Sequence, residues 1–401
     1  MFGLLLAAAT AAPAAPVANP DPKHLVVSPA DGAKAKSLVE KLASPAYEER
    51  EQAQAELSGL GRRAVPALAD ALARHPSAEV RARCRALYPR ARADDLQARL
   101  DTFAADEAGK FEHDLPGWAD FRLVAGGGKA ARKVFADVVA APFGRELVLG
   151  DLPPADLGMR VASRKQEIYN RRFTGARRVG DQPHEPSVAD VLALMYAESR
   201  VSSRHIPRTA TGTVVYTTPT FVAALQAGSE TAAVYRAVAG KWVSTRDEAL
   251  LMTQALAVGT TLELPEVGGL GARMMTAPGV LAAVKAQAAM AVAKVGDPSH
   301  LPALEAVFKD ESVVGTPFVQ DGPVTARVAL PVPVLLRDTA LAAALLVTGQ
   351  EPKDYGFEET FGRRDARFTN LNWALRADRR AAAFEKWTAW RGENPDFGKD
   401  R

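Results

Sequence analysis

The chain has 401 residues, 47% of them hydrophobic, so it is long enough to bury a large core or an extended one. The 50 basic and 47 acidic residues leave a net charge of +3, which gives no overall electrostatic case for a nucleic-acid or membrane partner. A single cysteine, Cys84, excludes an intrachain disulfide and a cysteine-built zinc site, and the six histidines are scattered. We therefore expect neither a metal nor a cofactor.

The first residues carry no charge and have the pattern of a secretory signal peptide. An apolar run over 2–12 is followed by small residues, and 12–14 (Ala-Pro-Ala) is a candidate cleavage triplet. The usual basic start is missing, so a disordered Ala/Pro tail and a misplaced start codon stay as alternatives. We assign 1–18 to a signal peptide and expect an extracytoplasmic location, in the periplasm, in the cell envelope or secreted.

The next segments are expected to be a linker followed by four short helices. Residues 19–34 are rich in proline, glycine and charge, as linkers are. Apolar residues then recur at helical spacing near 36–42, over 47–60 before Gly61, over 65–72, and over 80–87. We group 35–95 as N-terminal repeats of helices.

One spacing of residue types occurs in two widely separated parts of the chain. The first copy has Arg50, Ala53, Leu57, Leu60 and Gly61, and the second has Lys285, Ala288, Val292, Val295 and Gly296. Each copy is followed by a helix start of the form apolar-Pro-x-Leu, at 65–68 and at 301–304, and a partial third copy runs over 80–87. Such repetition is typical of stacked helix pairs, none of which can bury its apolar face alone.

These segments resemble the HEAT-repeat family. The resemblance rests on 45–61, 65–72, 77–87 and 284–308, about a quarter of the chain, in the order helix, glycine turn and apolar-proline helix start. Glu49 departs from the family pattern, which usually has an apolar residue before the arginine. The resemblance implies an α-solenoid, an armadillo-like helical stack that presents an extended surface to partners rather than performing chemistry.

The middle region, 96–270, is expected to be helical and irregular. A capped helix start is predicted at Ser187, and 245–248 (Thr-Arg-Asp-Glu) has the pattern of a capping box. The β-branched stretch 212–218 is either an extended segment or a loop, and we favour the loop because no partner strand stands nearby.

The last region, 271–401, is expected to contain further HEAT-like repeats and a Trp-rich terminal helix. A helix is predicted over 335–348, since Arg337, Asp338 and two prolines make 331–347 a core segment rather than a membrane span. The turn at 348–357 and the terminal helix with Trp387 and Trp390 resemble a segment of exported bacterial HEAT-like proteins of unassigned function. This second resemblance implies a compartment and supplies no activity.

Short motifs give no catalytic constellation. The glycines at 126–128 lack the spacing of a phosphate loop, and those at 268–271 lack the third glycine of a dinucleotide fingerprint, so a helix start and a turn are expected there. His113-Asp114 and His184-Glu185 are neighbours in sequence, whose side chains point apart, and we expect them to be solvated loop residues. We therefore assign no catalytic, cofactor-binding or metal-binding residue.

Basic residues are densest over 160–178. The possible anion-binding patch comprises Arg164, Lys165, Arg171, Arg172, Arg177 and Arg178. Such a run can bind an anionic polymer through counterion release, but a charge run is more often a solvated face or pairs with acids elsewhere in the fold.

The sequence as a whole predicts an all-α protein: an α-solenoid-like stack of HEAT-type helix pairs with an irregular helical middle region. The expected function is a non-enzymatic scaffold that binds a protein partner on its helical surface. Two alternatives stay open. One is an envelope component that binds an anionic polymer through 160–178, and the other is an enzyme with a site assembled from distant residues.

Overall fold

The computed structural model describes residues 19–141, 143–149, 152–173, 185–207, 212–295, 297–321, 328–360 and 367–398. Over these residues the chain is mostly helical, and its strands are short and paired two by two after residue 312. The helical class predicted from the sequence is therefore confirmed, whereas the small sheets were not predicted. The signal-peptide assignment at 1–18 lies outside the described residues.

The chain divides into two compact units. The first comprises 1–123 and 127–136, and the second comprises 124–126 and 137–401. This division differs from the predicted segments 35–95, 96–270 and 271–401, because residue 95 lies inside one long helix.

The helices of the first unit are α1 (Pro29–Lys41), α2 (Tyr47–Leu60), α3 (Val65–Arg74), α4 (Ala78–Ala105), α5 (Trp118–Ala125) and the start of α6 (Lys129–Ala140). Short connections make α1 and α2, and likewise α3 and α4, antiparallel neighbours. In addition, α1 contacts α3 and α2 contacts α4, so two helix pairs are stacked. Their apolar stripes form a single buried cluster that includes Leu38, Leu57 and Leu68.

The start of the first helix differs from the prediction. The segment 19–34 was expected to be a linker, but α1 begins at Pro29 and a 3-10 turn spans Pro22–Leu25. The reason is a local cap: the Ser28 hydroxyl accepts a hydrogen bond from the Asp31 backbone N–H at 3.1 Å, and proline suits the first helical turn.

Two arginines make the same contact at the start of α2 and of α4. Arg50 Nη1 donates to the carbonyl oxygens of residues 44 and 45, at 2.8 and 3.0 Å. Arg81 Nη1 donates to those of residues 75 and 76, at 2.6 and 2.8 Å. In both cases the guanidinium binds the carbonyl oxygens five and six residues earlier in the chain, in the turn that precedes the helix. The starts of α2 and α4 therefore share this contact as well as their sequence pattern.

The second copy of the sequence spacing folds in the same order as the first. Helix α15 (Ala282–Val295) is followed by the 3-10 turn Pro298–His300 and by α16 (Leu301–Glu305). In the first copy α2 is followed by the 3-10 turn Gly61–Ala64 and by α3, and Gly61 has φ 53°. Gly296 lies outside the described residues.

The second unit begins with helices that surround α9. They are α7 (Gly144–Leu149), α8 (Pro154–Phe173), α9 (Val188–Ser199), α10 (Gly212–Tyr216), α11 (Pro219–Gln226) and α12 (Glu230–Ser244). Helix α9 contacts α7, α8 and α12 and is buried along most of its length. Its predicted start is confirmed, since Ser187 caps it and Asp190 returns the hydrogen bond to the Ser187 backbone.

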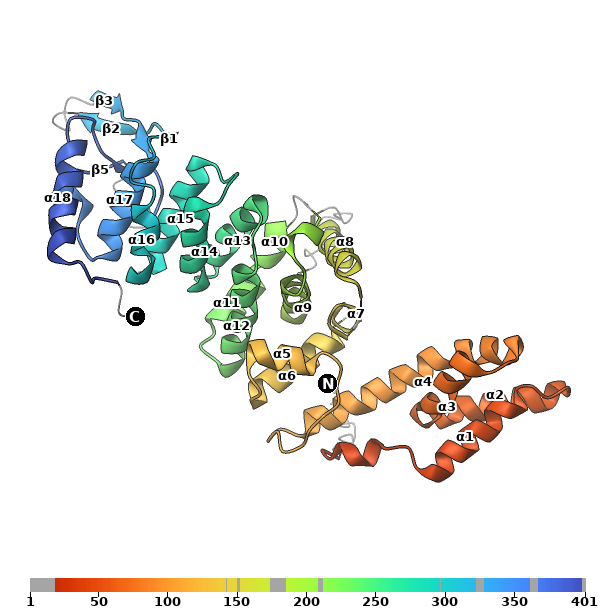
Figure 1. Cartoon of the computed structure of the whole chain (residues 1–401). Coiled ribbons are helices and arrows are strands. Elements are labelled where there is room, and N and C mark those ends of the chain that lie inside the picture. The colour runs from red at the N-terminus through yellow and green to blue at the C-terminus, as the bar shows by residue number, and fades with distance from the viewer. Residues whose placement is uncertain are drawn as a thin grey trace, which may run out of the picture. The chain divides into compact units, whose positions relative to one another are not determined.

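Further helices continue the second unit as stacked pairs. Helices α13 (Ala249–Thr261) and α14 (Glu266–Thr276) pack on each other, and α14 packs on α15. Helix α13 also contacts α15, and α14 also contacts α16. Helix α17 (Leu336–Val347), which confirms the prediction at 335–348, packs against both α15 and α16 (Figure 1).

The C-terminal part adds short antiparallel strands and the terminal helix. The strands pair as β1 (Val313–Gly315) with β4 (Val334–Leu335), β2 (Phe318–Asp321) with β3 (Val328–Pro331), and β5 (Glu358–Glu359) with β6 (Trp373–Ala374). The predicted terminal helix is α18 (Arg380–Glu393), which buries Ala383 and Trp387 and leaves Trp390 partly exposed. Trp387 packs edge-on against Phe308.

Three local expectations for the second unit were wrong. Residues 212–216 form α10 rather than a loop or a strand. The expected capping box at 245–248 does not form, because Thr245 ends α12 and Arg246 turns inward, so that α13 begins at Ala249 without a side-chain cap. The glycines at 268–271 lie inside α14 rather than in a turn.

The glycines of α14 are explained by close helix packing. A Cβ on Gly271 would lie 2.7 Å from Val292 Cγ2 and 3.0 Å from the Ala288 carbonyl oxygen, both in α15. A Cβ on Gly268 would lie 2.9 Å from His300 Cε1. Glycine is therefore needed for backbone approach between helices, which outweighs its low helix propensity.

Within the described ranges, no helix combines the length and the apolar character that a bilayer crossing requires.

Candidate functional site

Two pockets open side by side between α13 and α15. The first holds about 320 Å³, and the second holds about 470 Å³ and is bounded on one side by residues 368–370. Both are lined by Thr260, Ala291 and Lys294, so they form one continuous depression, which we name the α13–α15 groove. All of its lining residues belong to the second unit.

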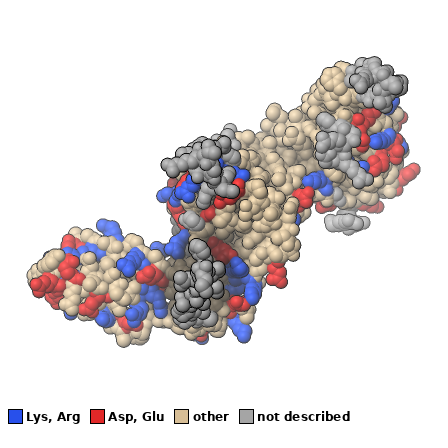
Figure 2. All heavy atoms as spheres, turned by 180° about the vertical axis from the view of Figure 1, so that it is seen from behind, with Lys and Arg blue, Asp and Glu red and all other residues tan. Residues whose placement is uncertain are grey.

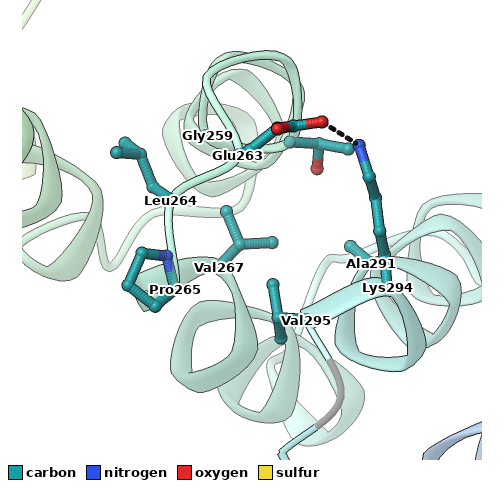
Figure 3. Close-up of a pocket in the computed structure, with 9 residues that line it drawn as sticks. Gly259, Glu263, Leu264, Pro265, Val267, Ala291, Lys294 and Val295 are labelled. Carbon is teal, nitrogen blue, oxygen red and sulfur yellow. Dashed lines mark hydrogen bonds and ion pairs between the residues drawn. The ribbon is translucent and has the colours of Figure 1, made fainter. Parts of the chain in front are cut away.

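The floor of the first pocket is apolar and closely packed. Leu264, Val267 and Ala291 line it and are almost fully buried (Figure 3). Gly259 also lines it, and a Cβ there would lie 2.5 Å from Val267 Cγ2, so glycine lets α13 approach α14. An apolar group that enters this pocket would therefore meet fixed apolar walls.

The rim of the first pocket carries an ion pair. Glu263, which follows α13, lies 3.3 Å from Lys294 of α15, and their side chains are 60% and 37% exposed (Figure 3). Such an exposed pair contributes about 0.2–1 kcal/mol to the free energy of unfolding.

The backbone at Glu263 is in the left-handed region, with φ 56°. It is the one non-glycine residue with positive φ in the part of the chain that the structure describes. This conformation costs a glutamate about 1 kcal/mol or more relative to glycine. Because the cost is as large as the gain from the ion pair, stability alone gives no reason for a glutamate here.

The second pocket has polar side chains that are not used by the fold. Among the described residues, Lys294 is the one charged side chain that lines it. The side chains of Gln287 and Asn370 line it too, and neither has a hydrogen-bond partner among the described residues. Phe368 forms part of the same wall and is 37% exposed. The groove can thus hold an apolar group and a hydrogen-bonding or anionic group next to each other.

The described members of the basic segment 160–178 are occupied by acids. Arg164 pairs with Glu146 at 3.0 Å and with Glu167 at 2.7 Å, and Glu167 also pairs with Arg171. The hydrogen bond from Arg164 holds the pKa of the Glu167 carboxyl below its usual range. These contacts favour the interpretation of the charge run as ion pairs within the fold.

Of the remaining members of the predicted patch, the structure describes Arg172 and Lys165, and each is paired with an acid. Arg172 lies 3.0 Å from Glu185, and Lys165 is buried. Arg177 and Arg178 lie outside the described residues. On the face seen in Figure 2, basic and acidic side chains are intermixed. No specific observation therefore favours an anionic polymer as the ligand of this segment.

Lys165 belongs to a buried polar cluster around Glu198, which the sequence did not predict. Lys165 Nζ donates to Glu198 Oε1 at 2.7 Å. Tyr216 Oη and Trp242 Nε1 donate to Oε2, at 2.7 and 2.5 Å. Arg246 Nη2 donates to the Glu198 backbone carbonyl at 2.8 Å. This Glu198 cluster joins α8, α9, α10 and α12 to the start of the next helix pair.

The protonation states in the Glu198 cluster follow from burial and charge. Burial raises the pKa of the Glu198 carboxyl, but the cations Lys165 and Arg246 outweigh it, so the pKa lies below its ordinary value of 4.5. Burial and the Glu198 charge raise the pKa of Tyr216 well above 10. The carboxylate is thus ionised, and both of its oxygens accept hydrogen bonds. Such an arrangement holds neighbouring helices together and does not donate a proton.

A second buried cluster lies in the first unit. Asp106 Oδ2 accepts hydrogen bonds from His113 Nε2 at 3.0 Å and from Arg132 Nη2 at 3.2 Å. His113 was expected to be solvated beside Asp114, but its side chain is 4% exposed and pairs with Asp106 instead. His184 lies outside the described residues.

The Asp106 contacts close a loop. Burial raises the pKa of its carboxyl, but the backbone N–H groups of Phe111 and Lys110 outweigh this effect and lower the pKa. The hydrogen bond between the buried His113 imidazole and Asp106 joins the two ends of the loop 106–113. Sequence reasoning missed it because the partners are seven residues apart and no local motif joins them.

Metal ligands do not gather within the described ranges: no group of three His, Cys, Asp or Glu side chains is placed to hold an ion there. Comparisons of the chain with models of protein families, with curated proteins and with solved structures found no match.

Proposed function

We propose that this protein is a non-enzymatic interaction scaffold, in which a HEAT-type stack of helix pairs presents the α13–α15 groove to a protein partner outside the cytoplasm. The solenoid arrangement is supported by the contacts of α13 with α15 and of α14 with α16, which are those of successive helix pairs. The repeated arginine contacts of Arg50 and Arg81 support it in the first unit.

The observation that carries the proposal is the groove itself. Neighbouring helix pairs in such a stack normally bury the space between them, yet α13 and α15 leave two joined pockets with unused amides from Gln287 and Asn370. Concave sites with an apolar floor and a few polar groups are the usual form of a binding surface. Since α13 carries no charged residue over Ala249–Thr261, the groove offers contact area at a low desolvation cost.

Site-specific cross-linking tests the scaffold function. A photoreactive residue at Gln287, an exposed position in the groove, is expected to yield one discrete protein adduct in the envelope fraction of the native host. The matched control carries the same residue at Ala233, an exposed position of α12 that lines neither pocket. Identical adducts at both positions, or none at Gln287, would contradict the proposal.

The extracytoplasmic location has its own test. It is supported by the uncharged apolar start of the chain and the small residues that follow. Intact-mass analysis of the protein from its native host is expected to show an N-terminus at Ala15, after the triplet 12–14. A protein that retains Met1 and fractionates with cytoplasmic markers would contradict export.

A further inference from the structure

We propose that the α13–α15 groove binds the carboxyl-terminal residue of its protein partner, when that residue has an apolar side chain. This inference rests on the proposed scaffold function and names the part of the partner that the groove recognises. Three features of the groove correspond to three groups of a terminal residue: its apolar side chain, its carboxylate and its backbone N–H.

The first pocket matches the apolar side chain. Its floor is formed by Leu264, Val267 and Ala291, which are buried and held by the packing of α13, α14 and α15. Its volume of about 320 Å³ is at the lower end of the range for ligand pockets. It therefore suits one side chain rather than a long segment.

Lys294 matches the terminal carboxylate. It lines both pockets, and no other charged side chain of the described ranges lies on the wall of the second pocket. The amides of Gln287 and Asn370 on the same wall supply further donors, and a carboxylate accepts several hydrogen bonds at once. Lys294 thus places an anionic group directly beside the apolar pocket.

The Glu263 carboxylate can accept a hydrogen bond from the backbone N–H of the partner's terminal residue. This carboxylate lies 3.3 Å from the Lys294 ammonium, and in a terminal residue the N–H and the carboxylate are attached to one Cα. One residue can therefore bind both members of the ion pair while its side chain enters the pocket beside them (Figure 3). This role also explains why a strained glutamate stands where glycine would be favoured.

The arrangement disfavours simpler ligands. An inorganic anion would meet Lys294, but it offers no N–H group to the Glu263 carboxylate and no apolar part to the first pocket. A purely apolar group would fill the first pocket but would form no hydrogen bond with Lys294, Gln287 or Asn370. The groove therefore selects a ligand that carries all three groups together.

Peptide binding by fluorescence polarisation tests the proposal on the full chain. The probe is an N-terminally labelled tetrapeptide ending in leucine, as the free acid, as the amide, and with serine in place of leucine. The free acid is expected to bind at least about tenfold more tightly than the amide, since a charge-assisted hydrogen bond is lost. The serine peptide is expected to bind more weakly than the leucine peptide.

Variants assign the binding to the groove. Lys294→Met and Glu263→Gly are each expected to weaken binding of the free acid several-fold or more. Glu263→Gly relieves the backbone conformation, so its melting temperature shows that a loss of binding is not a loss of folding. Lys285→Met, on the same helix but outside both pockets, is the matched control and should leave binding unchanged.

The outcomes separate this inference from the scaffold function. Equal affinity for acid and amide, or no saturable binding at millimolar peptide, overturns the chain-end proposal. If Gln287 still cross-links to one protein in that case, the scaffold function stands and the groove recognises another part of the partner. If the free acid binds but no protein cross-links at Gln287, the site stands and the scaffold function fails.

Discussion

Glu263 combines a strained backbone with an exposed ion pair, and the two effects oppose each other in stability. Its positive φ favours glycine, while its carboxylate contacts Lys294. Since the two magnitudes are similar, substitution can separate them.

The separation gives a prediction. Glu263→Gly is expected to leave the free energy of unfolding unchanged or slightly higher, because it removes the strain and the ion pair together. Glu263→Ala keeps the strain and is expected to be less stable than Glu263→Gly by about 1 kcal/mol. Urea unfolding of both variants measures the difference. Equal stabilities would mean that the backbone at 263 is not strained.

Glu198 gives a second prediction, which concerns pH. Its folded-state pKa is lowered below 4.5, so its stabilisation is complete above about pH 4.5 and is lost as the pH falls through the folded-state value. Glu198→Gln leaves Lys165 buried without its counter-charge and is expected to cost about 3–5 kcal/mol at neutral pH. This cost should shrink as the pH falls below about 4.5 and through the lowered folded-state pKa, where Glu198 of the wild type becomes protonated. Glu393→Gln, at an exposed position, is the control. A difference in the free energy of unfolding between Glu198→Gln and the wild type that does not change with pH would contradict this account.

At the scale of elements, the stacking of α14 on α15 depends on small residues. Alanines occupy much of the buried face of α15, and Gly271 faces Ala288 and Val292 across the contact. Backbone approach of this kind leaves no room for even one added methyl group.

A pair of glycine substitutions in α14 tests this packing. Gly269→Ala meets nothing closer than 3.9 Å and is expected to stabilise the protein by about 0.5–1 kcal/mol through helix propensity. Gly271→Ala gains the same propensity but overpacks the contact with α15, and a net loss of about 1–2 kcal/mol is expected. Thermal unfolding compares the two, and similar effects at both positions would show that the helices can separate without cost.

The first unit and the second unit each have a buried polar cluster of their own, and this organisation bears on the whole molecule. Asp106 and its partners form the cluster of the first unit, and Glu198 and its partners form that of the second. A substitution in one unit should therefore act mainly on the stability of that unit.

Calorimetry of the full chain tests this independence. Two unfolding transitions are expected. Arg81→Ala should lower the unfolding free energy of the first unit by about 1 kcal/mol and so lower the midpoint of its transition. Glu198→Gln should lower the midpoint of the transition of the second unit. A single transition that both substitutions shift by equal amounts would show that the chain unfolds as one cooperative unit.

Helices with strong local signals were predictable from the sequence, and those governed by distant contacts were not. The stripe over 47–60 predicted α2 with its bounds, and Ser187 predicted the start of α9. The box at 245–248 failed because burial of Arg246 against Glu198 overrides local capping. The glycines at 268–271 were misread because a turn signal in sequence and a close helix contact use the same residue type.

The groove itself could not be predicted, for a similar reason. Its walls come from α13, α15 and residues 368–370, which are far apart along the chain. Glu263 and Lys294 look like ordinary surface charges in the sequence, and only the backbone conformation of Glu263 distinguishes it.

Glu263 is also the joint between two helices, because α13 ends at Thr261 and α14 begins at Glu266. Residues 262–265 connect the two helices, and Glu263 is the position among them with positive φ. If the groove binds a chain end as proposed, a ligand that engages the Glu263 carboxylate acts on the connection between α13 and α14 as well as on the wall of the pocket.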